Sequence, residues 1–144
     1  MIAVDTNILV YAQRTDSPFH VPAAKRITEL AEGSGAWGIP WPCVHELLAI
    51  LTGTRIYDPP TTVAAALEYV DALFQSPSLV LLAETDLHWT TLRPLIAAGR
   101  VAGGRVHDAR IAAICIQHGV RELWSADRDF SRFPDLTVVN PLMR

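Results

Sequence analysis

The sequence predicts an α/β fold, a three-layer domain in which helices cover both faces of a mainly parallel sheet of about five strands. Short apolar segments alternate along the chain with longer segments whose apolar residues recur at helical spacing. Glycine, proline and small polar residues separate these segments. A length of 144 residues suits one hydrophobic core, so we expect a single domain over 1–144.

The first half of the chain begins with a strand and continues mostly as helices. An apolar run ends at Asp5, and helical periodicity follows at once. Glycines at 33 and 53 are natural helix stops, and Pro42 suits the first turn of a helix. The expected elements are a strand over 1–4, a helix over 6–13, a helix from 22 to 32, a strand over 37–40, a helix from 42 to 52 and a helix over 62–74.

The second half contains the remaining three strands. The segment 78–83 is short and continuously apolar, which predicts a fully buried strand. Gly119 is a good C-terminal cap for the helix before it. The expected elements are a strand over 78–83, a helix over 86–98, a helix over 107–118, a strand over 122–125 and a strand over 137–139.

Composition restricts the class of protein. No apolar run approaches the roughly 20 residues of a membrane span. The N-terminus lacks the features of a signal peptide, so we expect a cytoplasmic protein without membrane contact. Cys43 and Cys115 each lie in an apolar helical stretch and are expected to be buried thiols.

Four acidic residues lie where a solvated carboxylate is not expected. Asp5 ends the first predicted strand, and Asp127 follows the fourth. Glu46 and Asp108 interrupt the apolar faces of predicted helices. Buried carboxylates are costly unless they are paired, hydrogen-bonded or bound to a metal. Each also has a simpler explanation. Asp5 or Thr6 can cap the helix that follows, and Asp108 can cap its helix or favour the positive N-terminal end. Glu46 can lie at the edge of its face and reach water, and Asp127 can cap a turn or short helix before Phe130.

Convergence of these four side chains would imply a particular chemistry. Neighbouring carboxylates raise one another's pKa values unless a cation lies among them. Oxygen ligands without a set of thiolates or histidines favour Mg²⁺ or Mn²⁺ over zinc. Such ions commonly act on phosphates, so the ligand type indicates phosphodiester hydrolysis.

The charge of the chain neither supports nor excludes an RNA substrate. The net charge is −3, but neutralising four carboxylates at a metal site would leave the remainder slightly positive. Lys25 is the only lysine, so the other basic residues are arginines. Arginine grips phosphate groups with two parallel hydrogen bonds.

With these motifs the chain resembles the PIN-domain family, in particular the VapC-type toxins of bacterial toxin–antitoxin modules. The resemblance covers essentially the whole chain. Four motifs carry it: Val4–Asn7, Val44–Leu47, His107–Ala113 and Ser125–Phe130. The first alone is weak, whereas the four in this order and spacing are specific. The resemblance implies a PIN-like fold in which the first and fourth strands lie side by side.

The resemblance also implies an activity, that of a Mg²⁺- or Mn²⁺-dependent endoribonuclease. The acidic cluster of the family corresponds to the candidate catalytic residues Asp5, Glu46, Asp108 and Asp127. Asp5, Asp108 and Asp127 are the candidate metal ligands. The candidate supporting residues are Asn7 and Ser125, which would orient the carboxylates or their waters, and Asp129, an additional acidic position.

Family members are commonly homodimers inhibited by a VapB-type antitoxin, so the resemblance implies these partners beside an RNA substrate. The arginines nearest the acidic motifs are candidate RNA contacts: Arg100, Arg105, Arg110 and Arg128. Arg110 and Arg128 have the alternative of pairing with acidic neighbours. Trp37, Trp41 and Tyr57 look exposed and are candidates for a partner interface or for stacking on RNA bases, although packing in the core or at its rim explains each more simply. No role is indicated for His45 or His107.

Two other functions fit parts of the sequence. Phosphatases with an aspartate nucleophile also begin their site with a strand and an aspartate. They resemble Asp-x-Asp, however, and here Asn7 occupies the second acidic position, with no lysine placed as a phosphate partner. A PIN-like binding module without activity would have no need to retain four costly carboxylates.

Overall fold

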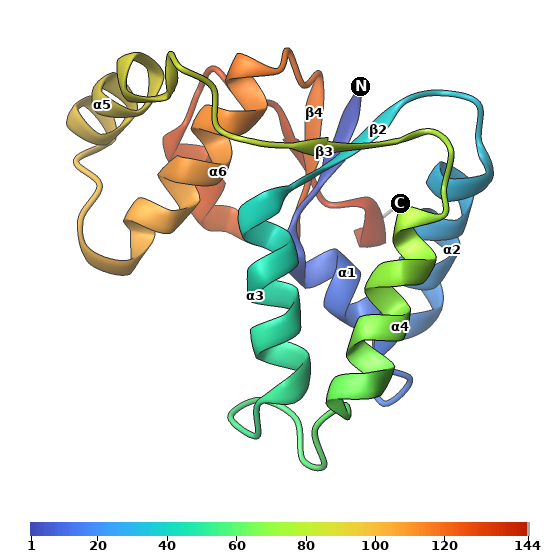
Figure 1. Ribbon diagram of the computed structural model, residues 1–144. Coiled ribbons are helices and arrows are strands. Elements are labelled where there is room, and N and C mark those ends of the chain that lie inside the picture. The colour runs from blue at the N-terminus through green and yellow to red at the C-terminus, as the bar shows by residue number, and fades with distance from the viewer. Residues whose placement is uncertain (144) are drawn as a thin grey trace.

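The computed structural model describes residues 1–143 and contains a five-stranded sheet flanked by six α-helices (Figure 1). The strands are β1 (Ile2–Val4), β2 (Trp37–Pro40), β3 (Leu79–Leu82), β4 (Glu122–Trp124) and β5 (Val138–Val139). They lie in the order β3-β2-β1-β4-β5, and every neighbouring pair is parallel. The predicted α/β class, with its parallel sheet and adjacent first and fourth strands, is confirmed.

Helices account for most of the remaining chain. They are α1 (Thr6–Gln13), α2 (His20–Glu32), α3 (Trp41–Thr52), α4 (Val63–Phe74), α5 (His88–Gly99) and α6 (Val106–Gln117). Three 3₁₀ turns complete the structure: η1 (Gly103–Arg105), η2 (Arg128–Arg132) and η3 (Pro141–Met143). No helix within residues 1–143 has both the length and the apolar character that crossing a membrane requires.

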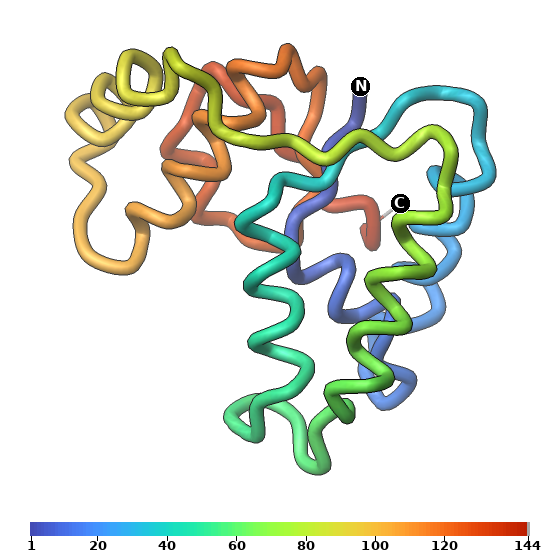
Figure 2. Tube along the Cα trace, viewed as in Figure 1, coloured from blue at the N-terminus to red at the C-terminus, as the bar shows by residue number. Residues whose placement is uncertain are grey.

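The helices pack as pairs around the sheet. Helix α1 packs against α2 and α3, α3 against α4, and α5 against α6. Figure 1 shows α3 and α4 projecting beyond the edge of the sheet where the strands end, while α5 and α6 lie to one side. The chain trace brings η3, near the C-terminus, back beside α2 (Figure 2). The carboxyl ends of β1 and β4 therefore lie between the pair α3 and α4 and the pair α5 and α6.

The register of β1 and β4 sets which side chains meet at this edge. Val4 pairs with Trp124, the last residues of their strands. The next backbone amide, that of Asp5, still donates to the carbonyl of Trp124 at 2.9 Å, and Ser125 N donates to Val139 O at 3.0 Å. Asp5 and Ser125 therefore leave the sheet side by side, although 120 positions separate them in the chain.

One sequence-based expectation about burial is wrong, and for Trp37 the simpler of two explanations holds. The strand predicted to be fully buried over 78–83 is β3, an edge strand whose Val80 is 39% exposed. Trp37 looked exposed in the sequence, but it packs in the core, the simpler explanation: it is completely buried in β2 and donates its indole N–H to Ser76 Oγ at 3.1 Å. Local apolar character does not reveal the order of strands in a sheet, and strand order decides both cases.

The cysteines are buried, whereas the two remaining candidate aromatic residues are partly exposed. Cys43 and Cys115 are buried free thiols, as predicted. Trp41 is 36% exposed, with its ring edge-on to Phe74 at 6.0 Å between centroids. Tyr57 is half-buried beneath the Arg14 guanidinium, 4.4 Å from the ring centroid.

Candidate functional site

Asp5 lies at the end of β1 and begins α1. Its side chain is only 5% exposed, and its Oδ1 accepts from the backbone N–H of Thr6 at 2.8 Å. Of the two candidate caps, Asp5 and Thr6, it is thus Asp5 that is the N-cap of α1. The Cys43 thiol donates to the same oxygen at 3.6 Å, and burial is the main reason that the pKa of Asp5 is raised.

Ser125 and Asn7 connect Asp5 to the turn after β4. Ser125 Oγ donates to Asp5 Oδ2 at 2.8 Å and accepts from the backbone N–H of Asp127 at 2.9 Å. Asn7 Nδ2 donates to Ser125 Oγ at 3.3 Å and to Asp5 Oδ2 at 3.5 Å, while Asn7 Oδ1 accepts from Ala126 N at 3.2 Å. Both carboxylate oxygens of Asp5 therefore already accept hydrogen bonds, and the network can hold its orientation.

Three further carboxylates converge in front of this network. Asp108 lies in the first turn of α6, Asp127 immediately precedes η2, and Asp129 lies within η2. Each offers one oxygen, and these three oxygens lie within 4.8 Å of one another. Asp127 also caps η2, since its Oδ1 accepts from Asp129 N at 2.8 Å. We name Asp108, Asp127 and Asp129 the acidic triad.

Charge crowding at the acidic triad is visible in the pKa of Asp108. Partial burial, followed by the negative charges of Asp127, Asp5 and Asp129, raises the pKa of Asp108 to about 6. Three carboxylates so close repel one another, so a cation among them would lower the free energy of the site. Only oxygen donors are present in the triad, and a hard divalent ion such as Mg²⁺ or Mn²⁺ suits that donor set.

Glu46 lies on α3, across from the triad. Its side chain is exposed, so it does not interrupt the buried face that Cys43, Val44 and Leu47 form. The alternative, that it lies at the edge of that face and reaches water, is the one the structure has. It lines a hollow of about 330 Å³ between α3 and α6, together with His45, His107 and Arg110. Partial burial there, with the charges of Asp5 and Asp108, raises the pKa of Glu46. The four predicted carboxylates are thus electrostatically coupled, although Glu46 and Asp5 do not belong to the triad.

The candidate arginines fall into two groups. Arg105 Nη1 lies 2.6 Å from Asp129 Oδ1, and Arg110 Nε lies 2.5 Å from Glu84 Oε1. Pairing with an acidic neighbour, the alternative for Arg110, is therefore what the structure has. Arg100 and Arg128 are exposed, and within residues 1–143 neither forms a salt bridge.

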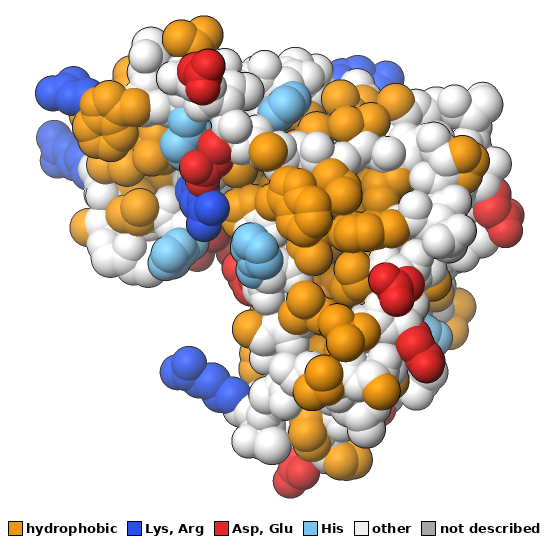
Figure 3. All heavy atoms as spheres, viewed as in Figure 1, with side chains coloured by type: hydrophobic (Ala, Val, Ile, Leu, Met, Phe, Trp, Pro, Cys, Tyr) orange, Lys and Arg blue, Asp and Glu red, His pale blue; other side chains and the backbone are white. Residues whose placement is uncertain are grey.

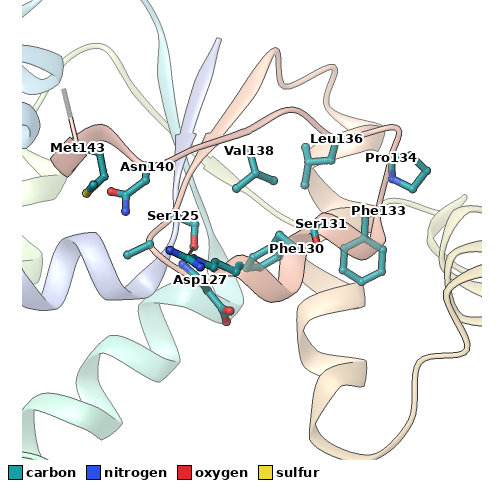
Figure 4. A pocket seen from close by; sticks show the side chains of 12 residues that line it. Ser125, Asp127, Phe130, Ser131, Phe133, Pro134, Leu136, Val138, Asn140 and Met143 are labelled. Atoms are coloured by element: carbon teal, nitrogen blue, oxygen red, sulfur yellow. Dashed lines mark hydrogen bonds between the residues drawn. The ribbon is translucent and has the colours of Figure 1, made fainter.

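The surface around the acidic residues is concave. Figure 3 shows acidic side chains at the inner corner of a notch between the part of the molecule with α5 and α6 and the part with α3 and α4, with histidines on either side. A separate cavity of about 580 Å³ lies between η2 and β5, walled by residues that include Phe130, Leu136 and Asn140. Figure 4 shows the Asp127 carboxylate directed away from that cavity. The segment 125–128 therefore separates the cavity from the acidic triad.

Some features of the site carry no clear signal in the sequence. The thiol of Cys43 contacts Asp5, yet its apolar surroundings predict only a core residue. Asp129 joins the triad, whereas its position in the motif marks only a supporting residue. Arg105 pairs with Asp129 across 24 positions, a separation at which sequence spacing predicts no contact.

Comparison with known proteins gives consistent results. A family model described as the PIN domain matches residues 2–136. VapC ribonuclease Mb2897 of Mycobacterium bovis is 32% identical over 142 residues, which cover 99% of this chain and 96% of the relative. Ribonuclease VapC33 of Mycobacterium tuberculosis is 31% identical over 142 residues, which cover 99% of each protein.

Solved structures with the same fold are also known. The crystal structure of VapC20 of Mycobacterium tuberculosis, described as a sarcin-ricin loop cleaving toxin, has a TM-score of 0.66 and 19% identity, covering 91% of this chain and 93% of that one. VapBC2 of Rickettsia felis, bound to a promoter DNA fragment, has a TM-score of 0.68 and 19% identity, covering 96% and 98%. At such identities the likeness shows the fold alone.

Proposed function

This chain belongs to the PIN-domain family and to its VapC ribonucleases, and from this premise we propose that it cleaves RNA at its acidic cluster with the help of Mg²⁺ or Mn²⁺. The observation that carries the metal dependence is the acidic triad, in which α6 and the turn after β4 place three carboxylate oxygens within 4.8 Å of one another. Next to the triad, hydrogen bonds from Ser125 and Asn7 hold the buried carboxylate of Asp5.

The triad suits a divalent cation. Asp108, Asp127 and Asp129 would hold the ion, because their oxygens are close enough to share it. When bound, Mg²⁺ or Mn²⁺ would lower the pKa of a coordinated water and offset negative charge on the phosphate. We propose Asp5 as a further ligand, and to reach the ion it would exchange the weaker of its present side-chain donors, the Cys43 thiol.

Glu46 is proposed as the group that accepts a proton from the attacking water. Its carboxylate is exposed and lies opposite the triad, where Asp5 and Asp108 help to raise its pKa. A raised pKa makes a carboxylate a stronger base, and a general base works best when its pKa approaches the working pH. Asn7 and Ser125 would keep Asp5 and the Asp127 turn in place during this step.

The RNA backbone would lie along the notch in Figure 3, with arginines as its phosphate contacts. Arg100 and Arg128 are exposed and form no salt bridge within residues 1–143, so they are the more available pair. Arg110 is engaged by Glu84 and would have to leave that carboxylate to contact RNA.

An antitoxin is the proposed protein partner. Several structural neighbours are toxin–antitoxin complexes, including one from Klebsiella pneumoniae and VapBC2 of Rickettsia felis. Hydrophobic side chains gather on the face that carries α3, α4 and β3 (Figure 3). Exposed hydrophobic residues of these three elements include Trp41, Val63, Leu67 and Val80. Co-purification with a small protein encoded beside this gene tests the antitoxin. Light scattering of the isolated chain tests the predicted homodimer.

RNA cleavage tests the central proposal. Total bacterial RNA is incubated with the wild type in Mn²⁺, in Mg²⁺ and in excess EDTA, and products are mapped by sequencing the new ends. We expect cleavage only with a metal, and a loss of activity in Asp5→Ala and Asp108→Ala. Asp71→Ala, which removes an exposed carboxylate from α4, is the matched control and should retain activity.

Three outcomes would contradict the proposal. Cleavage that persists unchanged in EDTA would exclude the metal. Full metal-dependent cleavage by both Asp5→Ala and Asp108→Ala would exclude the acidic cluster as the site. RNA binding without cleavage under any metal condition would favour a binding module.

A further inference from the structure

Arg105 occupies a distinctive place beside the acidic triad. It ends η1, the turn that joins α5 to α6, and its guanidinium reaches across to η2. Arg105 Nη1 lies 2.6 Å from Asp129 Oδ1, and the negative charges of Asp108 and Asp127 also act on it. Within residues 1–143, it is the only basic side chain in a salt bridge with any member of the triad.

The contact between Arg105 and Asp129 is a short ion pair, and the contact itself, followed by the charge of Asp129, raises the pKa of Arg105. The Nη1 atom is buried, yet it forms no hydrogen bond of acceptable geometry within the described chain. Both side chains are 43% exposed, and ion pairs of that exposure are weak. The guanidinium is therefore held by charge at a place from which another cation can displace it.

The backbone before Arg105 leaves it room to move. Gly103 has a φ of +62°, and a Cβ added at Gly103 or Gly104 would meet no atom within 4 Å. This part of the connection is open, and the arginine side chain itself is long and flexible. A shift of Arg105 away from Asp129 would consequently require no repacking of the core.

We propose that Arg105 is a resident counter-ion of the acidic triad, which competes with the divalent metal for Asp129 and, once displaced, binds the phosphate of the RNA. The inference rests on the proposed function and adds a positioning residue to it. Two cations beside one carboxylate repel each other, so a bound ion would favour release of the guanidinium. The nearest new anion would be the substrate phosphate, which arginine binds well.

The proposal predicts effects of opposite sign on metal and RNA. In Arg105→Gln, Mn²⁺ should bind about two- to tenfold more tightly, because its competitor is gone. The KM for RNA cleavage at saturating Mn²⁺ should rise, because a phosphate contact is lost. A purely structural role would weaken both, and a pure RNA contact would leave Mn²⁺ affinity unchanged.

The experiment measures Mn²⁺ dissociation constants by calorimetry in the absence of RNA, and KM separately with total bacterial RNA. Arg121→Gln is the matched control: it removes one exposed arginine immediately before β4, at the opposite edge of the sheet, and should change neither value. Arg105→Lys keeps the charge and should bind Mn²⁺ nearly as the wild type does. If Arg105→Gln fails to fold, Arg105→Ala removes the same charge and should show the same gain in Mn²⁺ affinity.

A double-mutant cycle identifies Asp129 as the shared partner. In an Asp129→Asn background, Arg105→Gln should give little further gain in Mn²⁺ affinity. An equal gain in both backgrounds would overturn the competition for Asp129.

Unchanged Mn²⁺ affinity in Arg105→Gln, with tight binding by the wild type, would overturn this inference and leave the proposed function intact. Absence of Mn²⁺ binding in every variant would overturn both, whereas an unchanged KM would overturn the role in RNA binding.

Discussion

The hydroxyl of Ser125 donates to Asp5 Oδ2 at 2.8 Å and thereby joins the carboxyl ends of β4 and β1. Ser125 Oγ also accepts from the backbone N–H of Asp127 at 2.9 Å. One small side chain therefore fixes two carboxylate-bearing segments relative to each other. Ser125 is 2% exposed, and water has little access to replace it. The spacing of the acidic cluster consequently depends on a residue that carries no charge.

Replacing Ser125 tests this dependence. Ser125→Ala leaves the buried Asp5 without its shortest side-chain donor, and we expect Mn²⁺ affinity or cleavage to fall about 10- to 100-fold. Calorimetry and RNA cleavage measure the two effects. Ser131→Ala removes an exposed hydroxyl from η2 and serves as the matched control. Wild-type values for both variants would show that the hydroxyl is dispensable.

Metal binding should weaken in acid because of Asp108. Its pKa of about 6 in the metal-free protein means that a cation must displace a proton below that pH. The Mn²⁺ dissociation constant should be nearly constant well above pH 6 and then rise by up to about tenfold per pH unit as the pH falls. Calorimetry in buffers of different ionisation enthalpy would detect the released proton. A flat profile from pH 7.5 to 5 would contradict the expectation.

The same carboxyl should destabilise the metal-free protein at neutral pH. The pKa of Asp108 is above its ordinary value of 3.8, so its contribution to stability is present below about pH 4 and is lost as the pH rises through about 6. Asp108→Asn should therefore raise the free energy of unfolding at pH 7.5 by about 1 kcal/mol, after allowance for solvent screening.

Thermal unfolding in EDTA measures this gain, which should vanish near pH 4. Excess Mn²⁺ should then reverse the order of the two proteins, since only the wild type retains all three triad carboxylates to bind the ion. A variant less stable than the wild type at pH 7.5 in EDTA would show that Asp108 has a structural role.

Arg128, which is free of salt bridges within residues 1–143, and Arg110, which is paired, should contribute differently to RNA binding. Arg128→Ala removes a cation that forms no salt bridge within residues 1–143, whereas Arg110 is paired with Glu84. We expect Arg128→Ala to weaken RNA binding more, and to reduce the dependence of log affinity on log salt by about one phosphate contact. The KM for RNA cleavage, measured over a series of salt concentrations, compares Arg128→Ala with Arg110→Ala. Equal effects would indicate that the Glu84 pair opens freely.

The elements of this fold were predictable because local patterns specify them. Helical periodicity before Gly33 and Gly53 predicted α2 and α3, whose caps are those glycines. The burial of β3 was not predictable in the same way. Its apolar residues suit an interior or an edge strand equally, and only its pairing with β2 alone places it at the edge.

The site was predictable to a similar depth. Asp5 and Asp127 follow strands, and parallel strands end at one edge, so their proximity follows from the predicted topology. Glu46 shows the limit of that reasoning. Its spacing along α3 put it on the apolar face, yet a rotation of the helix of a few tens of degrees suffices to bring such a residue to solvent, and packing sets that rotation.

The sequence by itself determined the parallel α/β architecture, the family and two of the three triad carboxylates, Asp108 and Asp127. Those properties depend on periodicity, on strand ends and on motif order, which are written locally along the chain. Only the tertiary structure decided that Asp129 joins Asp108 and Asp127 and that Arg105 pairs with Asp129. These contacts depend on how η1 and η2 pack around α6, and no local pattern specifies the relative position of segments so far apart.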